Sequence, residues 1–134
     1  MTHYLACSEP TFFAAYAPVA GSFWRPHPQA CAGPVKLLHT HGWSDGTFPL
    51  EGRIVGSGFA QGDAFVTTSI WRKTNECRQP RAKKFSKTGK FMRRAWTECK
   101  SGTALEFALF EGGHVVPSGW ADMAADWFEA VVDE

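Results

Sequence analysis

The chain is organised around the segment Leu38-His39-Thr40-His41-Gly42-Trp43-Ser44-Asp45-Gly46-Thr47. It predicts the end of a buried strand that breaks at Gly42 and presents an acid, Asp45, on the following loop. Near the other end, residues 108–114 (ALFEGGH) repeat this order, with a strand, a glycine break and the ionisable His114. An acid and a histidine that each follow a strand are two of the three members of a Ser-His-Asp triad.

Length and composition predict one globular domain covering residues 1–134. The chain has 134 residues, of which 44% are apolar and 20% charged, and its formal net charge is +1. The charge is uneven, because ten of the fourteen Lys and Arg residues lie between Arg72 and Arg94. No apolar run approaches the ~20 residues that span a bilayer. The start of the sequence shows no basic segment followed by an apolar one, as a signal peptide would have.

Apolar patterning predicts the α/β class. The expected order is a helix end at 1–8, strands at 12–20 and 35–40, a glycine-interrupted helix at 51–72, a basic loop at 73–90, a hairpin of 91–98 with 104–110, and a final helix after Pro117-Ser118. The first two strands are almost continuously apolar, which is typical of strands buried on both faces of a parallel sheet. Ser118 is a plausible N-cap for the final helix.

Asp45 and His114 each have a structural alternative. Asp45 lies in a Ser-Asp-Gly turn, where an Asp side chain often bonds its own backbone. His114 could be a surface loop histidine, although its ordinary pKa near 6.5 suits a general base. Together, in the order acid then histidine and each after a strand, the two residues favour a catalytic interpretation.

His39 and His41 point to the same face of the predicted strand, since they are two residues apart. That spacing suits a metal, but no third ligand is evident nearby, so we expect them to support the core or the acid loop. Two serines also follow glycines, Ser22 and Ser57, but neither lies in the G-x-S-x-G pattern of a nucleophile elbow.

The basic section 72–94 has two interpretations. Its Lys and Arg residues, with Phe85, Phe91 and Trp96 nearby, could bind nucleic acid through phosphate contacts and stacking. No nucleic-acid fold signature accompanies them, which favours a solvated loop.

The cysteines are Cys7, Cys31, Cys77 and Cys99, and no two of them form a CxxC pair. A zinc site built on them is therefore not expected. An even number of widely spaced cysteines suits two disulfides and an oxidising compartment, while buried free thiols are the alternative. Four cysteines allow three pairings, and the sequence does not choose among them.

Four segments resemble the polyhydroxybutyrate depolymerase and feruloyl esterase-like group of α/β-hydrolases. They are Leu5-Ala6-Cys7, Phe13-Ala14-Ala15-Tyr16-Ala17-Pro18-Val19-Ala20-Gly21, His41-Gly42 through Asp45, and Glu111-Gly112-Gly113-His114. Cys77 and Cys99, with Trp96 just before the second, are similar to that group as well. The resemblance implies the C-terminal portion of an α/β-hydrolase fold, with a mostly parallel sheet and an antiparallel hairpin near the C-terminal end. In that group the G-x-S-x-G elbow and the oxyanion-hole donors precede the first of these segments. The chain would thus begin just after the elbow.

The resemblance implies hydrolysis of carboxylic esters through an acyl-serine intermediate, with Asp45 as the acid and His114 as the base. The substrate would be a poly- or oligo-hydroxybutyrate, an aryl ester or a short-chain ester. No cofactor, metal, nucleic acid or membrane is implied, and we expect a secreted or periplasmic protein. We also expect that this chain alone does not act through a serine triad. The alternative is a non-catalytic binding module that uses section 72–94 on an anionic partner.

Overall fold

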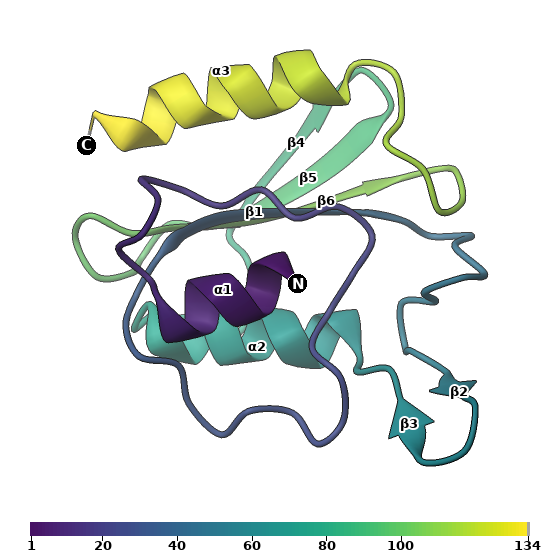
Figure 1. Ribbon diagram of the computed structural model, residues 1–134. Coiled ribbons are helices and arrows are strands. Elements are labelled where there is room, and N and C mark those ends of the chain that lie inside the picture. Colours follow the sequence, from purple (N-terminus) through teal and green to yellow (C-terminus); the bar gives the residue numbers. More distant parts are fainter. Residues whose placement is uncertain (134) are drawn as a thin grey trace.

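A computed structural model describes residues 1–133 (Figure 1). The elements in chain order are α1 (Thr2–Ser8), β1 (Lys36–Gly42), β2 (Ile54–Val55), β3 (Phe59–Ala60), α2 (Ala64–Thr74), β4 (Lys84–Thr88), β5 (Phe91–Trp96), β6 (Ala104–Phe110) and α3 (Trp120–Val132). A four-stranded sheet in the order β1-β6-β5-β4 forms the middle layer. The helix α3 covers one face of the sheet, and α1 and α2 cover the other (Figure 1).

The sheet is mixed and mostly antiparallel. Only β1 and β6 run parallel, whereas β5 pairs antiparallel with both β6 and β4. The expectation of a mostly parallel α/β-hydrolase sheet was therefore wrong, although the hairpin of β5 and β6 was predicted correctly. Part of the difference comes from β4, which lies in the section expected to be a loop. Lys84 and Lys87 on this strand fit an edge position, because charged side chains discourage edge-to-edge pairing.

The apolar run 12–20 does not form the expected strand, and the cause lies at Pro18. Tyr16 and Val19 make separate parallel bridges to β1. The Tyr16 N–H donates to the Lys36 carbonyl at 2.9 Å, and the Ala20 N–H donates to the Thr40 carbonyl at 2.9 Å. Between these two bonds stands Pro18, which has no N–H to donate and so interrupts the ladder.

The helix expected at 51–72 begins later, at Ala64, and runs two residues further. Before it lies the short hairpin of β2 and β3, in which each strand has two residues. The turn of this hairpin contains Gly56 and Gly58, with φ values of 62° and 91°. Such positive φ values cost little for glycine and do not occur in a right-handed helix. The side chain of Asp63 caps α2 by accepting from the Phe65 N–H at 2.7 Å and the Val66 N–H at 3.1 Å.

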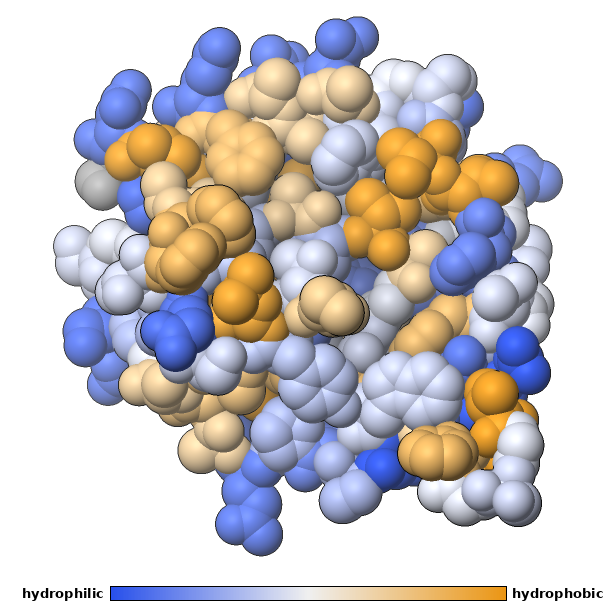
Figure 2. Space-filling view, viewed as in Figure 1, coloured by the Kyte–Doolittle hydropathy of each residue, from blue (hydrophilic) through white to orange (hydrophobic). Residues whose placement is uncertain are grey.

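The core has a part on each side of the sheet. On the α3 side, Leu38 and Phe110 pack against Met123, Ala124 and Trp127 of the helix, in agreement with the apolar stripe of the last segment. On the α1 and α2 side, the largest buried side chain is Trp71. Figure 2 shows apolar residues gathered over the upper part of the visible face, where α3 lies in Figure 1.

The expected N-cap of α3 is displaced by one residue. Gly119 occupies the cap with φ of 86°, and no side chain caps the helix. The Ser118 hydroxyl instead accepts a hydrogen bond from the Lys90 ammonium group at 2.9 Å.

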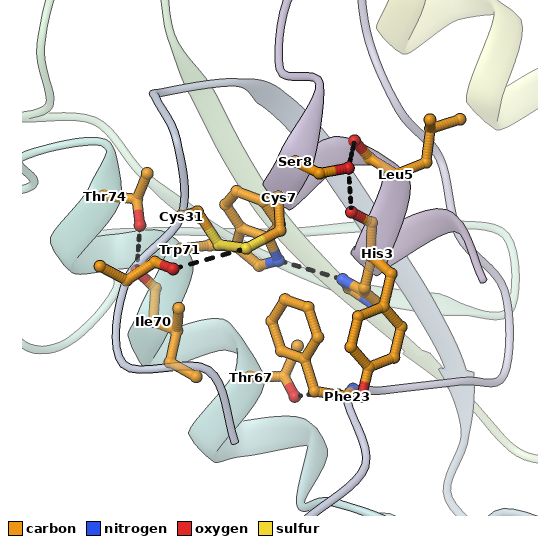
Figure 3. The surroundings of a disulfide bond; sticks show 12 residues. His3, Leu5, Cys7, Ser8, Phe23, Cys31, Thr67, Ile70, Trp71 and Thr74 are labelled. Carbon is orange, nitrogen blue, oxygen red and sulfur yellow. Dashed lines mark hydrogen bonds between the residues drawn. A yellow bond between two sulfur atoms is a disulfide. The ribbon is translucent and has the colours of Figure 1, made fainter. Parts of the chain in front are cut away.

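Two disulfides are present, Cys7–Cys31 and Cys77–Cys99. They join cysteines that lie 24 and 22 residues apart in sequence. The first ties α1 to the loop before β1 (Figure 3). The second ties the end of α2 to the turn after β5. Each closes a loop worth about 3 kcal/mol in the chain-entropy model. Both fit the expected oxidising compartment. Within residues 1–133, no helix is long and apolar enough to cross a membrane.

Candidate functional site

The loops that carry Asp45 and His114 begin side by side. The parallel register of β1 and β6 sets Gly42 beside Phe110, so both strands end at the same edge of the sheet. The Trp43 N–H donates to the Phe110 carbonyl at 3.1 Å, and the Ser44 N–H donates to the Gly112 carbonyl at 3.0 Å. A Cβ added at Gly42 would lie 2.3 Å from that Gly112 oxygen. The glycine is therefore what lets the two loops meet.

Asp45 and His114 are joined by a hydrogen bond. His114 Nδ1 lies 2.8 Å from Asp45 Oδ2. The carboxylate side chain is fully buried, whereas the imidazole is 44% exposed. An ionised carboxylate only accepts, so Nδ1 carries the proton and Nε2 keeps its lone pair. In residues 1–133 no hydrogen bond is made by Nε2, which leaves it free to take a proton from a bound molecule.

The two carboxylate oxygens of Asp45 have different partners. Its Oδ1 atom accepts from the Thr47 N–H at 2.9 Å and the Phe48 N–H at 2.8 Å, as in an Asp turn. Its Oδ2 atom remains available to His114. The turn therefore fixes the direction in which the carboxylate faces the imidazole.

Three more histidines form a buried chain of hydrogen bonds that leads to the same loop. The Trp71 indole N–H donates to His3 Nδ1 at 3.0 Å (Figure 3). His3 Nε2 lies 2.9 Å from His39 Nδ1, and His39 Nε2 lies 3.0 Å from His41 Nδ1. The chain ends where His41 Nε2 meets the Phe48 carbonyl at 2.7 Å.

The groups at the two ends of this hydrogen-bond chain determine which nitrogen of each histidine carries the proton. The indole of Trp71 only donates and the carbonyl of Phe48 only accepts, so His3, His39 and His41 must each carry one proton, on Nε2. A second proton on any of them would set two N–H groups against each other. The three rings are therefore neutral, and all their ring nitrogens are used.

Burial reinforces this neutral state. It lowers the pKa of His3 to about 3, with smaller contributions from the N-terminal charge and His41. Burial also lowers the pKa of His39 well below its ordinary value, helped by His3 and His41. The pKa of His41 is lowered by burial as well, although its bond to Phe48 and the charge of Asp45 oppose that shift.

The sequence prediction that His39 and His41 support the core or the acid loop matches this arrangement. The rings lie on one face and are stacked, with centroids 5.2 Å apart. Sequence reasoning missed His3 and Trp71. Their distance from the acid loop in sequence offers no local signal, although an unpaired histidine inside an otherwise apolar helix face would have been a reason to seek a buried partner.

The serines considered from the sequence lie elsewhere. The Ser22 hydroxyl is hydrogen-bonded to the Thr67 hydroxyl and faces the start of α2. Ser57 lies in the exposed turn between β2 and β3. Within residues 1–133, no serine hydroxyl is hydrogen-bonded to His114.

A comparison with protein-family models gives no match for this chain, and a comparison with curated protein sequences gives none either.

Proposed function

We propose that this chain supplies the acid and the base of a serine carboxylic-ester hydrolase. The observation that carries the proposal is the 2.8 Å hydrogen bond between His114 Nδ1 and Asp45 Oδ2, with the carboxylate buried and the imidazole half exposed. This combination orients the imidazole, selects its tautomer and stabilises its protonated form during proton transfer.

In the proposed reaction, His114 Nε2 takes the proton of a serine hydroxyl as that oxygen attacks the ester carbonyl. The imidazolium, stabilised by Asp45, then gives the proton to the leaving alkoxide. In the second half of the cycle, Nε2 takes a proton from water, which attacks the acyl-serine, and returns it to the serine oxygen. The one match to G-x-S-x-G, residues 42–46, contains Asp45 itself and is followed by a turn instead of the helix of a nucleophile elbow, so we infer that the nucleophile is not supplied by residues 1–134.

The proposed substrates are poly- or oligo-hydroxybutyrates, aryl esters or short-chain esters. Two features support an ester with an apolar acyl part. The site segments resemble those of polyhydroxybutyrate depolymerases and feruloyl esterase-like enzymes. In addition, the loops of the site expose the apolar side chains Trp43, Val115 and Val116. The two disulfides support a secreted or periplasmic location.

The test uses p-nitrophenyl acetate, an activated ester that water can attack with an imidazole as general base and no serine. We expect slow hydrolysis by residues 1–134, and a decrease of about 10²-fold in the protein-dependent rate in both His114→Ala and Asp45→Asn. His27→Ala is the matched control, since His27 lies outside the pair and accepts from the Asp63 N–H at 3.1 Å. An unchanged rate in His114→Ala would contradict the catalytic role.

A second measurement tests the source of the nucleophile. A serine-reactive fluorophosphonate should label no serine of this chain. Labelling at one serine that disappears in His114→Ala would show that the chain contains its own nucleophile. The acid–base roles would then stand, and the inferred external nucleophile would be wrong.

A further inference from the structure

A second candidate site lies away from Asp45 and His114, between α2 and the β4–β5–β6 side of the sheet. It is a pocket of about 460 Å³, within the range of small-molecule sites. Its walls are aromatic, formed by Phe65, Phe85, Trp96 and Phe107. Phe107 is fully buried and stacks on Phe65 with ring centroids 5.5 Å apart. Phe65 and Phe85 are 46% and 70% exposed, so the pocket presents apolar rings to solvent.

Three arginines line the same pocket, Arg72, Arg81 and Arg94. Arg94 lies over the Phe107 ring, 6.0 Å from its centroid. Arg72 reaches only the Cys77 carbonyl, at 3.5 Å. None of the three forms an ion pair within residues 1–133, and no acidic side chain of that range lines the pocket.

The neighbouring cations differ in this respect. Lys83 is paired with Glu98 at 2.9 Å, and Arg93 is paired with Glu106. Acids are thus within reach of this part of the sheet, but they neutralise side chains outside the pocket. Three of the cations of section 72–94 that form no ion pair within residues 1–133, Arg72, Arg81 and Arg94, line the apolar pocket.

The pocket wall also contains an unused donor. The indole Nε1 of Trp96 is buried and has no hydrogen-bond partner in residues 1–133, the one such side-chain atom found there. A buried N–H without a partner costs about 1–3 kcal/mol.

We propose that this pocket binds a small aromatic carboxylate. The ring would lie against the aromatic walls, and the carboxylate would meet the guanidinium groups, which bind planar anions through paired N–H donors. A concave apolar pocket with its charges on the wall suits a small planar anion better than a nucleic-acid strand, which needs a charged track along its backbone. This site is independent of the proposed ester hydrolysis, since it shares no residue with the Asp45–His114 pair.

The test is a calorimetric titration of the whole chain with 2-naphthoate and with the uncharged 2-naphthamide, which has nearly the same shape. We expect naphthoate to bind at least about tenfold more tightly, as one charge-assisted contact provides. Arg94→Gln and Arg81→Gln should each weaken naphthoate binding about tenfold. Arg78→Gln is the matched control, because it makes the same change in the same basic section but does not line the pocket. Circular dichroism of each variant establishes that it is folded.

The position of the ligand is tested by the indole N–H resonance of Trp96, which should shift on saturation with naphthoate. Equal affinity for the acid and the amide, or equal weakening by Arg78→Gln and Arg94→Gln, would overturn the proposal. Tighter binding of a single-stranded oligonucleotide that displaces naphthoate would also overturn it, in favour of a polyanion surface. His114→Ala should leave naphthoate binding unchanged, so this test and the ester test fail separately.

Discussion

The imidazole of His114 and the imidazoles of the buried histidines His3, His39 and His41 lie in opposite environments. His114 is half exposed and its ring N–H meets a carboxylate, which suits it to gain and lose a proton. The other three are buried, and their ring N–H groups meet only neutral acceptors. The partner and the exposure of each imidazole, and not its presence near an acid, determine whether one of its ring nitrogens is left without a hydrogen bond in residues 1–133.

The two groups meet at Asp45. His41 Nε2 lies 3.7 Å from Asp45 Oδ2, whereas His114 Nδ1 lies 2.8 Å from the same atom. His41 instead donates to the Phe48 carbonyl. The carboxylate is therefore left for His114, and the buried chain contributes to the site by holding the loop.

The largest expected effect is a loss of stability in mild acid. Burial lowers the pKa values of His3, His39 and His41 in the folded state, so the unfolded state binds more protons once the pH falls below about 6.5. The free energy of unfolding should be constant above that pH and decrease below it. The decrease is about 1.4 kcal/mol per pH unit for each fully affected histidine, and at most about 4 for all three.

Urea unfolding at pH 7.5 and pH 5.5 measures this effect. His114→Ala should keep the same pH dependence, because it leaves the buried chain intact. A free energy of unfolding that stays constant or rises between these two pH values would show that the three rings are not held neutral.

An effect of comparable size is expected from His39→Leu, which interrupts the buried histidine chain at its centre. Leucine leaves the N–H of His3 and the Nδ1 acceptor of His41 without partners. Each buried group without a partner costs about 1–3 kcal/mol, so the two groups predict a loss of about 2–6 kcal/mol in urea unfolding at pH 7.5. The control His27→Leu removes a single bond at a half-buried position and should cost about 1 kcal/mol. Similar losses of stability in both variants would contradict the stabilising role of the buried histidine chain.

The smallest effect on stability is expected from Asp45→Asn. The amide oxygen can still accept from the Thr47 and Phe48 N–H groups, so the turn should persist and stability should change by about 1 kcal/mol. The amide nitrogen would then face His114 and donate to Nδ1, which moves the imidazole proton to Nε2. The ¹⁵N chemical shifts of the His114 ring should report this change of tautomer. A ring that keeps its proton on Nδ1 would mean that Asp45 does not select the tautomer.

Local signals predicted several elements from the sequence. The apolar stripe of α3 and the alternation of Leu105, Phe107 and Leu109 in β6 each specify an element without knowledge of its neighbours. Asp45 and His114 were selected because each follows a strand, and the structure brings them into contact. Their catalytic roles stay a prediction.

Non-local features were missed for physical reasons. The direction of strand pairing depends on packing between distant segments, which hydrophobic periodicity does not encode, and the expected sheet was wrong for that reason. The basic composition of section 73–90 predicts a loop, whereas the structure forms β4 there with Lys84, Phe85, Ser86 and Lys87 all exposed at the sheet edge. The bond from Trp71 to His3 joins residues 68 apart, and no local pattern marks either partner.

Phe48 connects the two histidine systems through both of its backbone groups. Its N–H is held by Asp45 and its carbonyl by His41, so opening either bond loosens the backbone that positions the other. The amide hydrogen of Phe48 should therefore exchange with deuterium faster when the buried histidine chain opens. Its exchange rate would measure, at the candidate site, how firmly α1 is attached to the rest of the protein.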